Sequence, residues 1–229
     1  MSRRPNFDSQ QKLVDYLWNK KIILHEQIKN AMNMVDRKDF TDKNPYQDAP
    51  QTIGYNVTIS APHMHARALN DLFYQLQPGM KALDIGSGSG YLLAAMAYLV
   101  GSTGKVIGIE HMYGLSKKSV ENIMKNHSDL LWDENIEVFY GDGRYGYSPG
   151  APYDAIHVGA ASSKDVVERL CKQLKKGGKL VIPVQVTDNK QTFREYNKGQ
   201  DGTITFKNIT DVRYVPLTSQ KKQRTKNKI

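Results

Sequence analysis

Three side chains that can do chemistry lie within six positions of the stretch VTISAPHMHARAL, residues 57–69. A hydroxyl at Ser60 beside imidazoles at His63 and His65 suggests either a hydrolase nucleophile with its base or a metal site. Helix neighbours meet at i+3 or i+4, so two histidines at a spacing of two do not favour a shared metal ion. Ser60 also lacks the G-x-S-x-G pattern of a hydrolase elbow. We expect no metal here.

The stretch LDIGSGSGY, residues 83–91, favours the binding of a nucleoside. Its glycines follow an expected strand and allow a ligand to approach the backbone closely. Tyr91 breaks the dinucleotide pattern G-x-G-x-x-G, and GSTGKV at 101–106 fails the phosphate-loop pattern at its last position. Glu110 ends the next expected strand, where a carboxylate can accept hydrogen bonds from ribose hydroxyls. Asp84 adds an acid suited to an ammonium or sulfonium group, which favours S-adenosylmethionine over NAD or ATP.

The stretch GDGR, residues 141–144, follows a third expected strand. Asp142 can accept from an adenine amino group while a neighbouring backbone N–H meets a ring nitrogen. Asp-Gly is also a strong turn dipeptide, and taken alone the pair favours a simple turn. Together with the glycine loop and Glu110, binding is the favoured interpretation of Asp142 and Gly143.

The elements that position these residues follow an alternating pattern from residue 80 onward. Short apolar strands alternate with helices, which predicts an α/β fold with a mainly parallel sheet and helices on both faces. Two helices are expected in 8–35, an irregular arm at 41–56, and a helix with Ser60 near its N-cap and Pro62 in its first turn. The expected strands are 81–86, 105–110, 136–142, 153–159 and 179–184; the helices 91–100, 115–127 and 163–176, the last ending at Gly177-Gly178; and antiparallel strands 192–198, 202–209 and 212–217.

Composition predicts one globular domain without a membrane span. The 229 residues are 39% apolar and 24% charged, and no apolar run approaches the ~20 residues that a spanning helix needs. Cys171 is the one cysteine, expected as a small buried hydrophobe, and with no secretory signal we expect a cytoplasmic protein. The net charge of +9 is partly local to the tail SQKKQRTKNKI, expected to be solvated and partly disordered. Without interleaved aromatic residues, the tail does not favour nucleic-acid binding.

These motifs together resemble the protein-L-isoaspartate (D-aspartate) O-methyltransferase family along nearly the whole chain. The resemblance rests on NPYQDAPQTIGYNVTISAPHMHA, ALDIGSGSGY, GKVIGIEH, GDGR, APYDAIHVGAA, LVIPV and YVPLT. It implies a Rossmann-like S-adenosylmethionine-dependent methyltransferase fold with antiparallel strands at the C-terminal end. It further implies a monomer that methylates the free α-carboxylate of isoaspartyl residues in damaged proteins and peptides, after which the ester collapses to a succinimide. The sequence leaves open whether D-aspartyl sites are accepted.

The resemblance also implies roles for individual residues. Ser60 takes the position of the catalytic serine, with a part in substrate and cofactor binding, and Val215 that of a substrate backbone contact. The cofactor contacts fall on Thr58, Ile59, Ser60, His65, Asp84, Ile85, Gly86, Ser87, Gly88, Glu110, His111, Asp142, Gly143, Thr218 and Gln223.

The resemblance divides the single expected domain into four segments. These are N-terminal helices with a substrate-gating arm (1–79), a cofactor-binding core (80–185), C-terminal strands (186–217) and the basic tail (218–229). Gln185 stands where the family usually has glycine. His157 lies in an apolar strand and is expected to be a hydrogen-bonded core histidine.

Two rival functions remain open from the residues alone. The basic charge fits an S-adenosylmethionine-dependent RNA methyltransferase, or a non-catalytic protein that binds nucleic acid. The glycine loop, Glu110 and Asp142 argue against the non-catalytic rival. Small residues at Gly159, Ala160 and Ala161 argue against the methylation of exocyclic amino groups.

Overall fold

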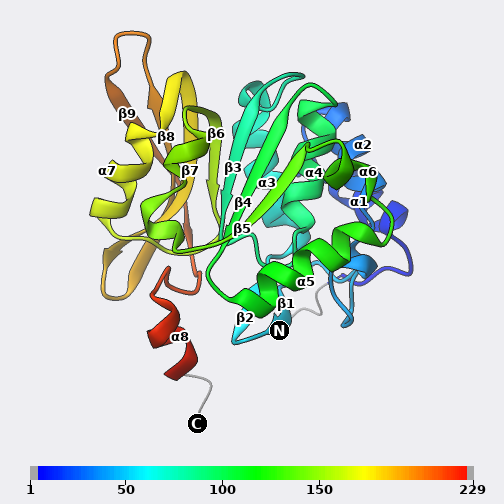
Figure 1. Ribbon diagram of the computed structural model, residues 1–229. Coiled ribbons are helices and arrows are strands. Elements are labelled where there is room, and N and C mark those ends of the chain that lie inside the picture. Colours follow the sequence, from blue (N-terminus) through cyan, green and yellow to red (C-terminus); the bar gives the residue numbers. More distant parts are fainter. Residues whose placement is uncertain (1–4, 226–229) are drawn as a thin grey trace.

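The computed structural model describes residues 5–225 and, within them, all side chains up to Gln223 (Figure 1). Its centre is a seven-stranded sheet in the order β5-β4-β3-β6-β7-β8-β9. The strands β3 to β7 are parallel, and β8 and β9 continue the sheet antiparallel. Their bounds are β3 Lys81–Ile85, β4 Lys105–Glu110, β5 Ile136–Tyr140, β6 Tyr153–Val158, β7 Leu174–Thr187, β8 Lys190–Lys198 and β9 Ile204–Val212. The expected fold class is confirmed.

The direction of the strand order changes at β3. From β3 the chain proceeds to β4 and β5 on one side, and then to β6 and β7 on the other. Ligands of open α/β sheets bind at such a point, outside the carboxyl ends of the strands. The glycine loop follows β3 directly, so the fold places it in this crevice.

Alternate residues of the central strands pack into two hydrophobic cores. Ala82, Val106 and Val181 face a core formed with the N-terminal helices, whereas Leu83 and Ile107 face a core formed with the helix α7, Lys164–Lys172. This alternation follows from the two-residue period of a strand and confirms the prediction of helices on both faces. The helices are α1 Gln10–Asn19, α2 Glu26–Met34, α3 Pro62–Leu72, α4 Tyr91–Val100, α5 Tyr113–Met124, α6 Asp129–Trp132, α7 Lys164–Lys172 and α8 Gln220–Thr225, with 3-10 turns at Arg37–Asp39, Phe73–Gln75, Gly143–Tyr145 and Ser148–Gly150.

Ser60 lies near the N-cap of α3 and Pro62 lies in its first turn, as predicted, but Ser60 is not the cap residue itself. The helix begins at Pro62, its N-cap is Ala61, and no side chain of the cap residue bonds to it. Asp48 takes this part instead, because its Oδ1 accepts from the backbone N–H of His63 at 3.0 Å. The Ser60 hydroxyl is therefore not used by the helix.

The prediction of a helix ending at Gly177-Gly178 is wrong. α7 ends at Lys172, and β7 begins at Leu174, which is buried and pairs with Tyr153. The two glycines lie in an irregular part of β7. A Cβ at Gly178 would lie 2.8 Å from the Lys175 carbonyl oxygen, so the close backbone approach explains this glycine.

Three further segments differ from expectation. The arm contains a hairpin of β1 Gln51–Gly54 and β2 Val57–Ile59. The expected strand 212–217 reduces to an isolated parallel bridge between Pro216 and Ala161, because β9 already ends at Val212. The first part of the tail forms α8, a helix that the sequence did not predict, while Lys226 and Lys228 lie outside the described residues.

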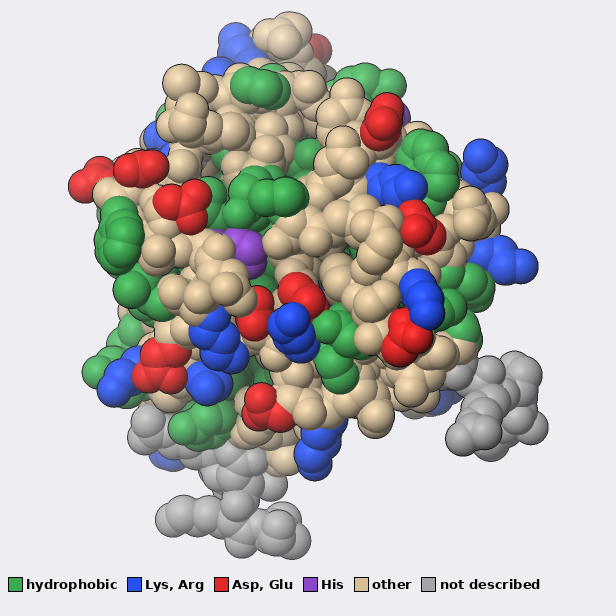
Figure 2. Space-filling model, turned by 90° about the vertical axis from the view of Figure 1, so that its right-hand side faces the viewer, with side chains coloured by type: hydrophobic (Ala, Val, Ile, Leu, Met, Phe, Trp, Pro, Cys, Tyr) green, Lys and Arg blue, Asp and Glu red, His purple; other side chains and the backbone are tan. Residues whose placement is uncertain are grey.

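The charges on one face of the molecule are mixed in sign. Figure 2 shows the side of the molecule near α1, α2 and α6, where acidic and basic side chains alternate among apolar ones. Of the helices that the structure describes, not one has the length and apolar character needed to cross a bilayer.

Candidate active site

A cavity of about 440 Å³ lies at the carboxyl ends of β3 and β6. Its volume falls in the range of small-molecule sites. It is bordered by the end of the hairpin, the start of α3, the glycine loop and the segment after β9. Among the sequence-predicted residues it is lined by Thr58, Ile59, Ser60, His65, Asp84, Gly86, Ser87, Gly88 and Val215.

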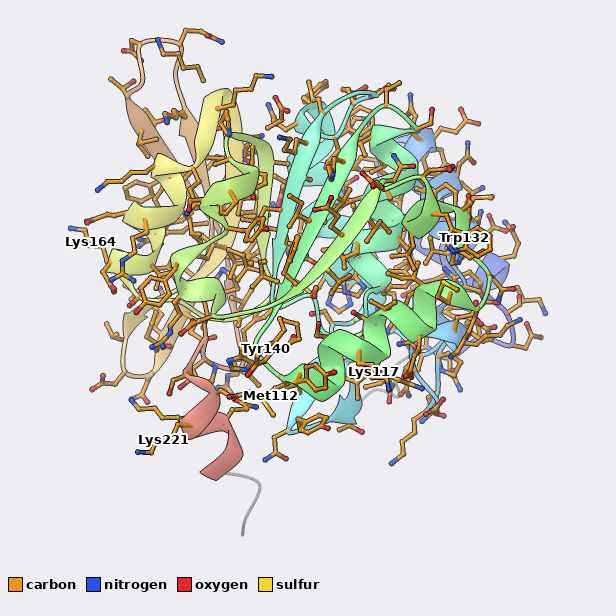
Figure 3. All side chains as sticks on the ribbon, in the orientation of Figure 1. Met112, Lys117, Trp132, Tyr140, Lys164 and Lys221 are labelled. Atoms are coloured by element: carbon orange, nitrogen blue, oxygen red, sulfur yellow. The ribbon has the colours of Figure 1, made fainter. Side chains whose placement is uncertain are left out.

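A second, narrow cavity of about 40 Å³ adjoins it and shares Gly86 and Val215 with it. In Figure 3, Met112 and Tyr140 mark the end of the sheet that faces α8. The predicted residues that line this narrow cavity include Glu110, His111, Gly143, Thr218 and Gln223. Two predicted residues line neither cavity: Ile85 packs in the core, and Asp142 binds Arg144.

Glu110 connects the end of β4 to the glycine loop. Its Oε2 accepts from Gly88 N–H at 3.1 Å, and its Oε1 accepts from Met112 N–H at 2.9 Å. Burial raises the pKa of Glu110, and the two backbone donors oppose this shift. Each carboxylate oxygen can accept more than one hydrogen bond, so the group retains capacity for ribose hydroxyls.

The glycine loop packs against β4 and α5. Gly86 has a φ of 74°, and its N–H donates to Ile109 O at 2.8 Å. Gly90 has a φ of 88°, and a Cβ there would lie 3.0 Å from Ser119 Cβ in α5. Both positions require glycine, the first for its left-handed conformation and the second also for space.

Asp84 and His157 form a buried pair in the floor of the larger cavity. The distance between Asp84 Oδ1 and His157 Nδ1 is 2.7 Å. A carboxylate only accepts hydrogen bonds, so His157 Nδ1 carries the proton of this bond. The expectation that His157 is a hydrogen-bonded core histidine is confirmed, and its partner is the acid expected to face an ammonium group.

Arg37 is a buried residue that the sequence did not single out. Its side chain is 0% exposed, donates to His65 Nδ1 at 3.2 Å and to Ser60 O at 3.2 Å, and lies 5.2 Å from the Tyr91 ring centre. Burial lowers the pKa of Arg37 to about 10, so it remains charged at neutral pH. Arg37 thus holds Ser60 and His65 in place, and only long-range contacts reveal it.

The bond from Arg37 fixes the state of His65. A guanidinium only donates, so His65 Nδ1 must be the acceptor and Nε2 carries the proton. Burial, and then the nearby Arg37 charge, hold the pKa of His65 well below its usual range. His65 therefore lines the cavity as a neutral hydrogen-bond donor. His63 has a different partner, because its Nδ1 lies 2.8 Å from Asp48 Oδ1.

The residues present fit a nucleoside-bearing cofactor. Ser87 lines the larger cavity, and its buried Oγ has no hydrogen-bond partner among the described residues. Buried hydroxyls are normally bonded, so this one is available to a ligand. A Cβ at Gly143 would overlap Ile85 Cγ2, which explains the glycine that opens the narrow cavity.

Asp142 lies in a turn. Its Oδ1 accepts from Arg144 N–H at 3.1 Å, and its carboxylate forms an ion pair with the Arg144 guanidinium. Arg144 lowers the pKa of Asp142. In this structure the carboxylate is held by a neighbour, and Gly143 alone of the pair lines the narrow cavity.

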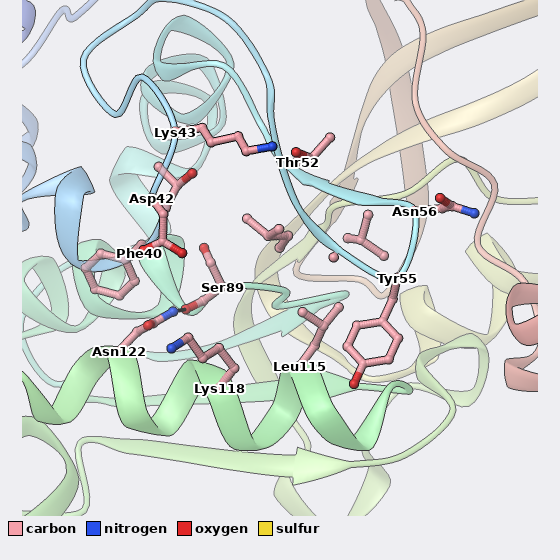
Figure 4. A pocket seen from close by; sticks show the side chains of 14 residues that line it. Phe40, Asp42, Lys43, Thr52, Tyr55, Asn56, Ser89, Leu115, Lys118 and Asn122 are labelled. Atoms are coloured by element: carbon pink, nitrogen blue, oxygen red, sulfur yellow. Dashed lines mark hydrogen bonds between the residues drawn. The ribbon is translucent and has the colours of Figure 1, made fainter. Parts of the chain in front are cut away.

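Another cavity, of about 650 Å³, lies beside these two and is lined differently. Figure 4 shows Asp42 and Lys43 of the arm and Lys118 of α5 around it. It shares Val57 and Ser89 with the larger site cavity but includes neither Ser60 nor Glu110. We assign the chemistry to the smaller cavities because the hydroxyl, the buried acids and the glycine loop converge there.

Comparisons with known proteins agree on one family. The family model for protein-L-isoaspartate(D-aspartate) O-methyltransferase matches residues 8–222. A protein-L-isoaspartate O-methyltransferase of Caenorhabditis elegans is 48% identical over 227 residues, covering 99% of this chain and 100% of that protein. Protein-L-isoaspartate O-methyltransferase 1 of Arabidopsis thaliana is 48% identical over 214 residues, 92% of each chain.

A solved structure extends this similarity to three dimensions. A Plasmodium falciparum chain, assigned as a protein-L-isoaspartate O-methyltransferase and crystallised with S-adenosyl-L-homocysteine, matches with a TM-score of 0.86 at 35% identity. The match covers 93% of this chain and 100% of that one.

The buried His65 predicts that stability falls in acid. The folded protein keeps His65 neutral, whereas the unfolded chain takes up a proton below about pH 6.5. The free energy of unfolding therefore decreases as the pH falls below that value, by up to about 1.4 kcal/mol per pH unit for this group. His65→Asn keeps an acceptor for Arg37 and removes the titration. The free energy of unfolding, measured with urea between about pH 5 and 7.5, should depend less steeply on pH in this variant than in wild type.

The comparison with wild type isolates His65. Burial also lowers the pKa of His127, but His127 is present in both proteins and its contribution cancels. If the unfolding free energy depends equally on pH in the two proteins, the assignment of a neutral, buried His65 is contradicted.

Proposed function

The chain belongs to the protein-L-isoaspartate(D-aspartate) O-methyltransferase family, and we propose that its two adjoining cavities hold the cofactor and the carboxylate acceptor. The protein is a protein-repair methyltransferase that uses S-adenosylmethionine to methylate isoaspartyl residues. The observation that carries this conclusion is the family match over residues 8–222. The rival function of an RNA methyltransferase is not supported.

We propose that the cofactor lies along the glycine loop, across the narrow cavity and the adjoining part of the larger one. When bound, S-adenosylmethionine supplies a methyl group activated by a positively charged sulfur. Glu110 accepts from ribose hydroxyls with the lone pairs that Gly88 and Met112 leave available. Thr218 and Gln223 enclose the narrow cavity from the C-terminal side. Gln223 is held there because its Nε2 donates to Tyr55 O at 2.8 Å.

The acceptor carboxylate needs no base. Carboxyl groups titrate near about 4, so the substrate is already ionised at neutral pH. The work of the chain is to position the two reactants, which can supply much of the acceleration. Ser60 and His65 line the same cavity, and each can donate a hydrogen bond to a carboxylate oxygen. Asp84 and His157 line its floor, and Asp84 provides the negative charge that suits the cofactor ammonium group.

The substrate backbone is proposed to lie along the segment after β9. Val215 is exposed and lines both cavities, and its carbonyl accepts from Ala161 N–H at 2.8 Å. Gly159 lines both cavities and Ala160 lines the narrow one, and the absence of bulky side chains at these positions leaves room for a peptide to approach. An extended peptide recognised through its main chain explains how one site serves many protein substrates.

We propose a single domain that acts as a monomer in the cytoplasm. One hydrophobic core joins Leu13 and Met32 of the N-terminal helices to Val106 and Phe193 of the sheet. Cys171 is buried and unpaired, which suits a reducing compartment.

A paired-peptide assay tests the function. Two peptides that differ only in aspartyl versus isoaspartyl linkage are incubated with the enzyme and methyl-labelled S-adenosylmethionine. Label should appear on the isoaspartyl peptide and not on its aspartyl twin, and RNA should remain unlabelled. Label on RNA alone, or equal label on both peptides, would contradict the proposed function.

Removing the Ser60 hydroxyl should slow methyl transfer. If Ser60 donates to the acceptor carboxylate, Ser60→Ala removes a hydrogen bond to a charged group, and kcat/KM should fall about 10- to 100-fold. The hydroxyl does not cap α3, so the unfolding free energy should change little. Thr210→Ala, on the exposed strand β9, is a matched loss of a hydroxyl and should keep wild-type kinetics. Full activity in Ser60→Ala would refute the role.

A further inference from the structure

The mouth of the larger cavity carries one cation without a partner. Arg213 is exposed, lines the cavity, and has no ion pair or hydrogen bond among the described residues. Its neighbours are all engaged. Asp211 lies 3.4 Å from the Lys190 ammonium group, and His63 is bound to Asp48.

The other charges that line the cavity are also paired. Asp84 is bound to His157, and neutral His65 receives its bond from Arg37. The cavity mouth therefore presents one uncompensated positive charge. A positive group in that place attracts an anionic part of an incoming substrate.

The segment that carries Arg213 is held in place, so this charge has a defined position. We call residues 211–217 the acceptor strap. The side chain of Gln191 clamps its centre, because its Oε1 accepts from Tyr214 N–H at 2.7 Å and its Nε2 donates to Tyr214 O at 3.1 Å. Gln185 Oε1 accepts from the same Gln191 Nε2 at 2.9 Å. The backbone of Ala161 also binds the strap, at residues that follow Tyr214 in the chain.

Gln185, the departure from the family pattern, thus has a structural role. Its side chain amide also donates to the carbonyls of the β7–β8 turn, including Thr187 O at 2.5 Å. It connects that turn to the clamp on Tyr214. The clamp fixes the backbone beside Arg213 while the guanidinium remains exposed.

We infer that Arg213 selects isoaspartyl substrates that carry an acidic residue about two positions from the isoaspartyl site. Exposure alternates from Asp211 to Val215, with Arg213 and Val215 exposed and Tyr214 half-buried between them. Extended chains advance about 3.3 Å per residue. An extended peptide whose acceptor residue lies level with Val215 therefore brings a side chain two residues away level with Arg213. The inference rests on the proposed function, since it assigns specificity to the same site.

The expected selectivity is modest because the pair is solvent-exposed. Exposed guanidinium–carboxylate pairs correspond to about a two- to five-fold preference in kcat/KM. The preference also weakens as salt screens the two charges.

A peptide series tests the inference. Isoaspartyl peptides carry a single glutamate at one of the three positions on either side of the isoaspartyl residue, and each has a glutamine twin. Wild-type kcat/KM should favour glutamate over glutamine about two- to five-fold near one of the second positions at low salt. Arg213→Gln should bring the glutamate-to-glutamine ratio of kcat/KM to about one. Arg213→Glu should invert the preference and favour a peptide with lysine in place of the glutamate.

Controls separate this inference from the proposed function. Lys164→Gln, at an exposed position in the first turn of α7, makes the same charge change away from the cavities and should keep the wild-type ratio. Unchanged affinity for S-adenosyl-L-homocysteine shows that the Arg213 variants are folded. If wild type methylates the glutamine peptides but shows no preference, or if Arg213→Gln keeps the preference, the inference fails while the function stands. If wild type methylates none of the peptides, the proposed function itself fails.

Discussion

The buried carboxylate of Glu110 is the interaction on which the site depends. It ends β4 in an environment that penalises charge, and it remains there because Gly88 and Met112 donate backbone N–H groups to it. These two bonds join the glycine loop after β3 to the turn after β4. The carboxyl ends of β3 and β4, two neighbouring parallel strands, are thereby fixed relative to each other. A nucleoside that lies across them meets a preformed surface.

The same physical rule explains the rest of the site. Buried polar groups need partners, and most of those in the cavity find them within the protein. Asp84 is bound by His157, and His65 and the Ser60 carbonyl are bound by Arg37. Ser87 and Tyr91 are exceptions among the residues that line it, since their buried hydroxyl oxygens have no partner among the described residues. Satisfied groups define the shape of the cavity, and the Ser87 hydroxyl in the glycine loop marks where a ligand can complete it.

The sequence predicts the parts of this structure that local chemistry determines. Alternation and glycine placement located the parallel strands, the loop after β3 and the acid that ends β4. Long-range contacts account for the failures. Asp48 caps α3 from the arm, which no local pattern around Ser60 reveals. Leu174 leaves the helical pattern because it pairs with Tyr153, and Arg37 acts through a fold that brings it beneath His65.

If Glu110 organises the cofactor site, its loss should weaken the binding of S-adenosyl-L-homocysteine. Calorimetric titration should show that Glu110→Gln weakens binding about 10- to 100-fold, because one amide oxygen cannot replace two carboxylate oxygens. Glu137→Gln alters a carboxylate on β5 that pairs with Lys105 and should bind as wild type does. Equal affinity of Glu110→Gln and wild type would contradict the account.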